Sequence, residues 1–148
     1  MATAANIRAA NTNDAARLRR CMESAYAPYL KRMGRARLPP MDVDYATEIE
    51  NFPCWVVDSA GDILGGLIMV FTEDQASIAN IAVDPDAQGQ GVGGMLMRFA
   101  ESTAKEKGFT RLQLTTHALL KENLSFYTHL GWQETGTEAD RVYLHKEL

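Results

Sequence analysis

The order of helix-like and strand-like segments predicts an α/β fold built around one mixed central β-sheet. Three observations carry this prediction. Apolar residues recur at helical spacing in two long segments, short apolar runs bounded by turn residues lie between them, and a glycine-rich loop opens the second helix. The length of 148 residues is typical of one domain, so we expect residues 1–148 to form a single domain.

The N-terminal third is expected to hold one strand and two helices. Ile7 to Ala10 is strand-like, and Asn11 to Asp14 is rich in helix-capping residues. The first helix places apolar residues on one face: Leu18, Cys21, Met22, Ala25, Tyr26 and Tyr29. Lys31 to Pro40 is basic and ends in prolines, which predicts a loop, and Asp42 to Asn51 predicts a short helix.

The middle of the chain predicts three strands that follow one another as a meander. Their segments are Cys54 to Val57, Ile63 to Phe71 and Ala76 to Val83, with a turn at Ser59 to Asp62. The third segment is apolar at nearly every position. We therefore expect it to be covered on both faces.

The C-terminal part predicts a long helix, a strand, a short helix and a hairpin. The long helix ends at Gly108, and its apolar face consists of Val92, Met95, Leu96, Phe99, Ala100 and Thr103. Arg111 to Thr115 is strand-like, and Leu124 to Leu130 has helical spacing. Trp132 to Thr137 and Arg141 to His145 are expected to form the closing hairpin.

Composition disfavours several classes of protein. The apolar share of 46% and charged share of 23% are typical of a soluble domain, and Ile63 to Phe71 is too short for the roughly 20 residues of a membrane helix. The net charge of −4 disfavours nucleic-acid binding. Cys21 and Cys54 lack metal-ligand spacing, so we expect no metal site. Because no secretory signal is visible, we expect a cytoplasmic protein without membrane partners.

Asn80 to Gly94 is the segment with the strongest functional signal, N-I-A-V-D-P-D-A-Q-G-Q-G-V-G-G. Glycines there permit positive φ and the close approach of a ligand. The first N–H groups of a helix lack internal partners and lie at the positive end of the helix dipole. The segment therefore predicts a site for a phosphate or pyrophosphate. The structural alternative is that the glycines only form a tight turn.

Two other phosphate-binding motifs fit this loop less well. Gly89, Gly91 and Gly94 spell G-x-G-x-x-G, but no acidic residue follows about 20 positions later, as dinucleotide folds require. A Walker A loop is excluded because no Gly-Lys-Ser/Thr follows. A nucleotide-binding protein is thus a minor alternative.

The same loop resembles a known family. Gln88 to Gly93 is similar to the Gln/Arg-x-x-Gly-x-Gly/Ala signature of GCN5-related N-acetyltransferases, the GNAT superfamily, and Ile81 to Pro85 is similar to the strand before it. Asn123 to Trp132, with its Phe-Tyr pair and Gly-Trp end, resembles the late motif of the family. The resemblance covers essentially the whole chain. It implies a single-domain GNAT-like fold, with helices on both faces of the mixed sheet.

This resemblance implies transfer of an acetyl group from acetyl-CoA to an amine, without a metal. The family binds the pyrophosphate on backbone amides of the glycine loop and pairs the pantetheine arm with the preceding strand, as in β-augmentation. The residues that it assigns to the cofactor are Ile81, Val83, Gln88, Gly89, Gln90, Gly91, Val92, Gly93, Gly94 and Asn123. Asn123 is ambiguous, because the family Asn stands seven residues before the late Tyr, where this chain has Leu120. Asn123 either contacts pantetheine or caps its helix.

Tyr127 matches the family tyrosine that often protonates the departing thiolate, whose pKa is about 8.5 by analogy with cysteine. The alternative is a core aromatic, because Tyr127 shares a helical face with Leu124 and Leu130. No base is apparent: Ser77 stands where some members carry Glu. His117 could assist, but a loop histidine is the preferred interpretation, and a water relay or no base is also open.

The acceptor site is expected within Tyr26 to Asn51, because the family builds it from the first helices and their loop. Asp44 and Glu48 would share one helical face and could attract a cationic amine. The basic run from Lys31 to Arg37 could instead bind a carboxylate or the cofactor phosphates, and a solvated surface is the plain alternative. Tyr26 and Tyr29 either line the cleft or pack in the core.

The function that we expect is an acetyl-CoA-dependent N-acetyltransferase, an acyltransferase that acts by direct attack of an amine on the thioester. The acceptor would be a primary amine of a small molecule or peptide, and the family also forms homodimers. The alternative is a non-catalytic acyl-CoA-binding module or sensor.

Overall fold

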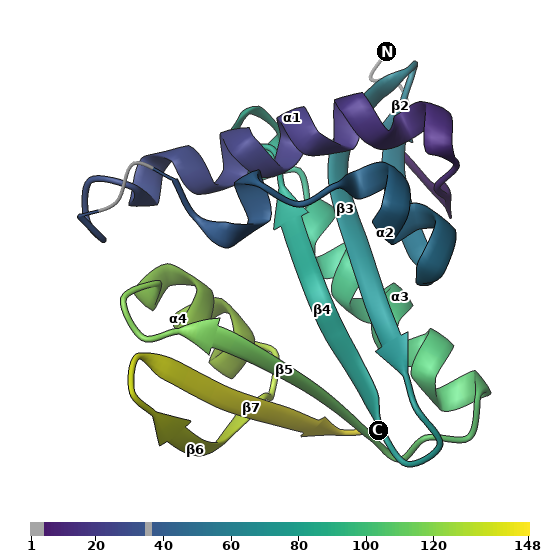
Figure 1. The fold of residues 1–148 in the computed structure, drawn as a ribbon. Coiled ribbons are helices and arrows are strands. Elements are labelled where there is room, and N and C mark those ends of the chain that lie inside the picture. Colours follow the sequence, from purple (N-terminus) through teal and green to yellow (C-terminus); the bar gives the residue numbers. More distant parts are fainter. Residues whose placement is uncertain (1–4, 35–36) are drawn as a thin grey trace.

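Seven strands form one continuous sheet in the computed structural model, which describes residues 5–34 and 37–148 (Figure 1). The strand order is β1-β2-β3-β4-β5-β7-β6, and β4 and β5 run parallel while the other neighbours are antiparallel. The expected α/β fold with a mixed sheet is therefore confirmed. The strands are β1 (Asn6–Ala9), β2 (Cys54–Ser59), β3 (Asp62–Phe71), β4 (Ala76–Val83), β5 (Arg111–His117), β6 (Gln133–Glu138) and β7 (Arg141–Glu147).

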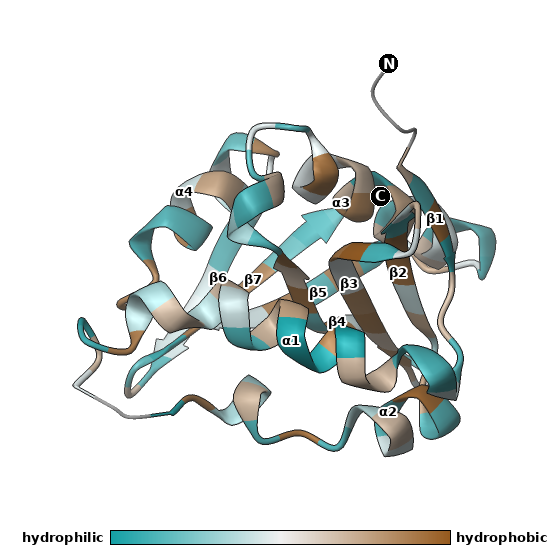
Figure 2. Cartoon of the chain, turned by 90° about the horizontal axis from the view of Figure 1, so that it is seen from above, coloured by the Kyte–Doolittle hydropathy of each residue, from teal (hydrophilic) through white to brown (hydrophobic). Residues whose placement is uncertain are grey.

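Helices cover both faces of this sheet (Figure 2). They are α1 (Ala15–Tyr26), α2 (Tyr45–Asn51), α3 (Val92–Glu106) and α4 (Lys121–His129), joined by the short 3-10 turns η1 (Thr12–Asp14), η2 (Ala27–Tyr29), η3 (Pro39–Met41) and η4 (Pro85–Ala87). α1 and α2 lie on one face, and α3 and α4 lie on the other. Each face has its own buried apolar cluster, with Leu18 of α1 in one and Leu96 of α3 in the other.

β4 contains a bulge that the sequence does not reveal. The register with β3 passes from Ile68↔Asn80 to Met69↔Ile78, so Ala79 is an extra residue in β4. The extra residue reverses the alternation of side chains. Ile78 therefore packs in the cluster with α3, whereas Ala82 packs in the cluster with α1. Ala79 itself is exposed, which corrects the expectation that β4 is covered throughout.

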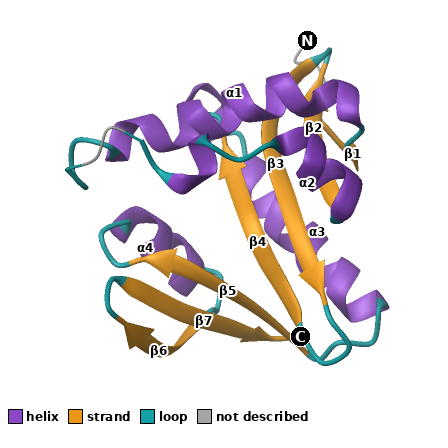
Figure 3. Ribbon diagram, in the orientation of Figure 1, coloured by secondary structure: helices purple, strands orange, loops and turns teal. Residues whose placement is uncertain are grey.

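The sheet splits beside this bulge. β4 pairs with β5 only where Ala76–Ile78 lies beside Leu112–Leu114, and past that point the two strands diverge (Figures 1 and 3). The second half of β4 therefore presents one edge to open space rather than to a neighbouring strand. This V-shaped opening is where the candidate site lies.

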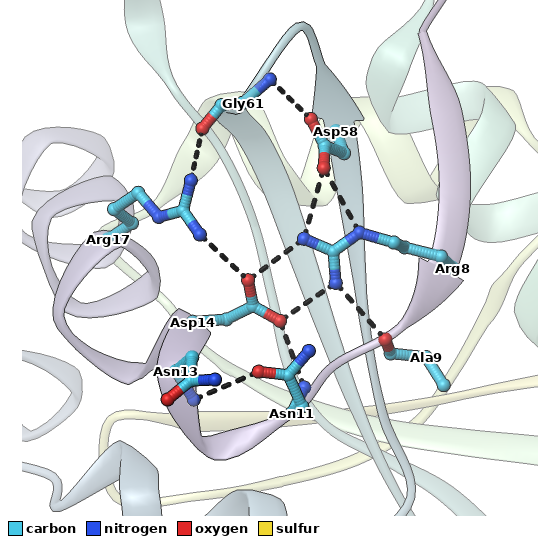
Figure 4. Close-up of polar contacts among 8 residues, drawn as sticks. All are labelled: Arg8, Ala9, Asn11, Asn13, Asp14, Arg17, Asp58 and Gly61. Atoms are coloured by element: carbon cyan, nitrogen blue, oxygen red, sulfur yellow. Dashed lines mark hydrogen bonds and ion pairs between the residues drawn. The ribbon is translucent and has the colours of Figure 1, made fainter.

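An ion-pair network around the buried Asp14 holds the N-terminal strand to the first helix (Figure 4). Asp14, at the start of α1, is only 1% exposed and accepts two hydrogen bonds of 2.8 Å from the guanidinium of Arg8 on β1. Arg8 also binds Asp58 of β2 at 3.0 Å, and Arg17 of α1 reaches Asp14 at 3.2 Å. The network joins β1, α1 and β2.

Candidate functional site

A hollow of about 550 Å³ lies between the free edge of β4, the glycine loop and α4. Its lining includes every residue that the sequence assigned to the cofactor except Gln90. Gln90 lines a separate hollow beside α1, with Arg17 and Asp84. The structure thus brings together two segments that lie far apart in the sequence, the glycine loop before α3 and the late motif on α4. We call this hollow the cofactor cleft.

The glycine loop leaves several backbone N–H groups unbonded at the start of α3. Gly91 is the N-cap of α3 with φ of 77°, and Gly89 has φ of 85°, so both occupy the left-handed region that favours glycine. Among the described residues, the N–H groups of Gly91, Val92 and Gly93 have no hydrogen-bond acceptor. These groups lie at the positive end of the helix dipole, which is a suitable environment for an anion.

Gly93 has a packing reason of its own. A Cβ atom placed there would lie 3.2 Å from Cζ of Phe126 on α4, so the missing side chain allows α3 and α4 to approach each other. The turn alternative raised by the sequence therefore accounts for part of the loop, at Gly89 and Gly91. It does not account for the N–H groups that remain free.

The free edge of β4 presents backbone groups to the cleft. The N–H of Asp84 donates to the carbonyl of Leu64 on β3 at 2.8 Å. Because successive residues of a strand direct their backbone polar groups to opposite edges, those of Val83 and Ile81 face away from β3, toward the cleft. An extended ligand with amide groups can pair with such an edge.

Tyr127 is both a core residue and a cleft residue. Its side chain is 6% exposed, and its ring centroid lies 5.7 Å from that of Phe126 and 6.0 Å from that of Trp132. It nevertheless borders the cofactor cleft and a second hollow of about 370 Å³. Burial raises the pKa of the Tyr127 phenol, with smaller contributions from Tyr26 and Tyr29, so the hydroxyl keeps its proton at neutral pH.

The second hollow lies on the acceptor side of Tyr127, and we call it the acceptor hollow. It is lined by residues of η3, β4, β5, the start of α4 and the β6–β7 turn. Four residues border both hollows, and they are Tyr26, Ile81, Asn123 and Tyr127. A molecule in one hollow would therefore meet a molecule in the other beside Tyr127. Tyr26 and Tyr29 line the cofactor cleft, and Tyr26 also packs against the apolar cluster beneath α1.

Asn123 does not cap its helix. The N-cap of α4 is Leu120, which makes no side-chain capping bond, and Asn123 is the third residue inside the helix. The capping alternative is therefore wrong. Asn123 instead borders both hollows, within the same helix as Tyr127.

The two ring nitrogens of His117 are both engaged. Nδ1 accepts a hydrogen bond from the N–H of Leu119 at 3.0 Å, so Nε2 carries the proton and donates it to Asp140 at 3.0 Å. The ring has no free lone pair with which to take a proton from an amine, which supports its interpretation as a structural loop histidine. Ser77 lies in a different hollow, on the open face of β5 and β7.

The charged residues expected at the acceptor site are used elsewhere. Asp44 is the N-cap of α2, and its carboxylate accepts from the N–H of Thr47 at 3.2 Å. It therefore does not share a helical face with Glu48, and within the described ranges neither residue lines the acceptor hollow. The structure therefore gives no support to the carboxylate pair that the sequence allowed, and it fits the plain alternative of a solvated surface.

The basic loop is also engaged in ion pairs. Arg32 binds Glu122 of α4 at 2.7 Å, and Arg37 binds Asp42 at 2.7 Å, while Arg35 falls outside the described residues. The loop residues that line the acceptor hollow are apolar, namely Met33, Leu38, Pro39 and Pro40. Apolar residues within a basic loop are visible in the sequence and indicate a lining surface. That signal was not used in the prediction of the acceptor site.

Metal clusters and membrane helices are both absent from the described residues. In ranges 5–34 and 37–148, no three His, Cys, Asp or Glu side chains gather closely enough to hold a metal ion. No helix within the same ranges is long and apolar enough to cross a bilayer.

Comparisons with known proteins converge on one family. The model of the acetyltransferase (GNAT) domain matches residues 50–134, which is more than half of the chain. The uncharacterized N-acetyltransferase YjgM of Escherichia coli K12 is 35% identical over 83 residues, covering 53% of this chain and 50% of that protein. The ribosomal protein bS18-alanine N-acetyltransferase of E. coli K12 is 36% identical over 61 residues, covering 41% of each. The chain spans about half the length of the curated relatives it matches.

Solved structures show the same fold along the full chain. The PaiA N-acetyltransferase of Thermoplasma acidophilum, solved with coenzyme A, has a TM-score of 0.83 at 18% identity and covers 98% of this chain and 99% of that one. The ribosomal-protein-S18-alanine N-acetyltransferase of E. coli has a TM-score of 0.78 at 21% identity, over 97% and 94% of the two chains. At these identities the likeness concerns the fold.

Proposed function

The chain belongs to the GNAT acetyltransferase family, and from this premise we propose that it transfers an acetyl group from acetyl-CoA to a primary amine. One observation carries the proposal. A single cleft joins the free N–H groups of the glycine loop to Tyr127 along the unpaired edge of β4. A long ligand with a phosphate end and amide groups in its arm would meet the glycine loop, the β4 edge and Tyr127 in that order.

The residues of the cleft suit acetyl-CoA along its length. The free N–H groups of Gly91, Val92 and Gly93 would bind the pyrophosphate, and Gln88, Gly89 and Gly94 would line its site. The N–H of Gln90 donates to the carbonyl of Ala87 at 3.3 Å, so Gln90 would shape the loop rather than bind. Ile81 and Val83 would pair with the pantetheine amides, and Asn123 would contact the same arm. Acetyl-CoA supplies the thioester whose carbonyl carbon the amine attacks.

Tyr127 is proposed to act as the general acid. Its raised pKa keeps the proton on the hydroxyl at neutral pH, so Tyr127 is present as a donor. The sulfur gains negative charge as the C–S bond breaks, and Tyr127, which borders both hollows, would donate its proton to that sulfur and regain one from water. Donation while the bond breaks avoids the release of a free thiolate and favours formation of the amide.

The acceptor is proposed to enter through the acceptor hollow, from the side of η3 and the β6–β7 turn. Its volume of about 370 Å³ accommodates a small amine or the first residue of a peptide. Two relatives are named as alanine N-acetyltransferases of a ribosomal protein, so peptides that begin with alanine belong among the acceptors tested.

A thiol-release assay across a panel of amines tests the proposal. The panel contains amino acids, polyamines and peptides with N-terminal alanine, and mass spectrometry identifies each acetylated product. The expected result is thiol release that depends on one class of amine. Calorimetric binding of acetyl-CoA without thiol release to any amine would instead identify a non-catalytic acyl-CoA-binding module, and binding of NAD alone would identify a nucleotide-binding protein.

A further inference from the structure

Two tyrosines approach the junction of the hollows from opposite elements. Tyr26 is the last residue of α1, on one face of the sheet, and Tyr127 comes from α4 on the other. Both border the cofactor cleft and the acceptor hollow. The family motif assigns a role to Tyr127 alone. Tyr26 therefore borders both hollows without an assigned task.

The hydroxyl of Tyr26 is oriented by Asn80. The phenol donates to Oδ1 of Asn80 at 3.4 Å. Burial raises the pKa of Tyr26 to about 12, so the phenol keeps its single proton at neutral pH. Because that proton is directed at Asn80, the lone pairs of the Tyr26 oxygen remain available to accept a hydrogen bond.

A third tyrosine, Tyr45, lies near the same amide. The hydroxyl of Tyr45 donates its proton to the carbonyl of Pro40. The Asn80 side chain lowers the pKa of Tyr45, against the larger effect of burial, which raises it. Oδ1 of Asn80 is the atom that faces the hydroxyl of Tyr26.

The bulge in β4 brings Asn80 to this position. Asn80 directly follows the extra residue Ala79 and shares the α1 face with Ala82. Without the extra residue, the alternation of the strand would place the Asn80 side chain on the α3 face, away from Tyr26. The bulge that opens the cofactor cleft thus also builds the Tyr26–Asn80 pair on its acceptor side.

We infer that Tyr26, oriented by Asn80, accepts a hydrogen bond from the N–H of the attacking amine and so aims the nitrogen lone pair at the acetyl carbon; this inference rests on the proposed acetyltransferase function. In the reaction the N–C bond forms and the C–S bond breaks. The neutral amine gives up one proton to water, the sulfur receives one from Tyr127, and Tyr127 regains a proton from water. Tyr26 takes no proton. Tyr26 accepts a hydrogen bond from the amine, and Tyr127 donates a proton to the sulfur.

The first test compares Tyr26→Phe with Tyr143→Phe, which removes a hydroxyl bonded to Glu138 on the open face of the sheet. With the best amine of the panel, Tyr26→Phe is expected to lower kcat/KM for the amine by about tenfold, the effect of one hydrogen bond made to the reacting group. The Kd for acetyl-CoA should stay within about twofold of the wild type. Tyr143→Phe is expected to leave both quantities unchanged.

The second test changes Asn80. Asn80→Leu removes the acceptor for the Tyr26 proton and should lower kcat/KM about as much as Tyr26→Phe, with no further loss in the double variant. Asn80→Asp keeps an acceptor oxygen and should retain most of the activity.

The outcomes separate this inference from the proposed function. A wild-type protein that acetylates no amine contradicts the proposed function, and the inference with it, before any variant is made. A wild-type protein that acetylates an amine while Tyr26→Phe does so equally well overturns the inference alone. An equal loss of acetyl-CoA binding and of amine transfer in Tyr26→Phe also overturns it, because that pattern indicates a structural role.

Discussion

Two buried ionisable side chains in this protein are held in opposite protonation states by their surroundings. Asp14 receives hydrogen bonds from Arg8 that lower the pKa of its carboxyl, against the opposing effect of burial, so it stays charged. Tyr127 has no such charged partner among the residues that the structure describes, and burial is the largest cause of its raised pKa. Asp14 thus serves as a fixed ion pair in the fold, whereas Tyr127 retains a proton that it can donate.

Removal of the Tyr127 hydroxyl tests its role as an acid. Tyr127→Phe keeps the ring that packs on Trp132 and Phe126 and is expected to preserve the fold. We expect kcat to fall by about 100-fold, the lower range for loss of a general acid, while the Kd for acetyl-CoA stays nearly unchanged. Steady-state thiol release and calorimetry measure the two quantities. Normal turnover in the variant would remove Tyr127 from the mechanism.

Asp14→Asn tests the ion-pair network. The variant leaves the Arg8 guanidinium without its main counter-charge, so we expect the free energy of unfolding at pH 7 to fall by about 3 kcal/mol. Urea denaturation measures it. Glu23→Gln, which removes one partner of the exposed pair with Arg19, is the control and should cost less than about 1 kcal/mol.

The same network predicts a pH dependence with a defined sign. The pKa of Asp14 is lower in the folded state than its unfolded value of 3.8, so its contribution to stability is fully present above that value. The contribution is lost as the pH falls through the folded-state pKa. The difference in stability between wild type and Asp14→Asn should therefore shrink only below pH 3.8. A difference that already shrinks between pH 7 and 5 would contradict this assignment.

At the scale of secondary-structure elements, the site depends on how β4 ends and α3 begins. The strand stops at Val83, η4 turns the chain, and Gly91 starts the helix with a positive φ. The residues of the first turn of α3, whose N–H groups lack acceptors among the described residues, thereby line the cofactor cleft. Side-chain identity matters little for such a site, because backbone geometry supplies the donors.

Gly91→Ala tests that geometry. An alanine at φ of 77° is strained by about 1 kcal/mol, which the loop can relieve by moving its N–H groups out of place. We expect the Kd for acetyl-CoA to rise about tenfold by calorimetry. Gly136→Ala, in β6, is the matched control, because a Cβ atom there meets open space at an ordinary φ. Equal effects of the two substitutions would show that the glycine loop is not the binding element.

Sequence pattern predicted these elements well where the signal is local. The apolar run from Ala76 to Val83 matches β4 residue for residue, and Gly108 lies just past the end of α3. The bulge at Ala79 was not predicted, because one extra residue does not change the pattern of a run that is apolar at nearly every position. Asp44 was placed on a helical face, although an Asp at this position more often caps the helix, as it does here.

The sequence predicted only those parts of the candidate site that belong to a sequence motif. The loop and Tyr127 were identified because glycine spacing and the late motif are sequence features. The Tyr26–Asn80 contact joins residues 54 positions apart, and it depends on the bulge and on the angle of α1. The engagement of both His117 nitrogens likewise depends on Asp140 in the β6–β7 turn, which no local pattern indicates.

At the scale of the whole molecule, the sheet consists of two parts with a narrow connection. β1 to β4 form one part, β5 to β7 form the other, and three residue pairs between β4 and β5 join them. The cofactor cleft lies in the V between these parts, lined by β4 and the glycine loop on one side and by α4 on the other. A ligand in the cleft therefore contacts both parts at once and stabilises their relative position.

Thermal unfolding tests this arrangement. Acetyl-CoA at about 100 times its Kd should stabilise the folded protein by about 2.7 kcal/mol. For a chain of this size that corresponds to an increase in Tm of roughly 5 to 10 °C, in a single transition, because a ligand that spans both parts couples their unfolding. Differential scanning calorimetry measures the Tm and the number of transitions. NAD at the same concentration is the control and should leave the Tm unchanged. Two transitions of which acetyl-CoA moves only one would contradict the bridging position of the ligand, because a ligand bound to one part stabilises that part alone.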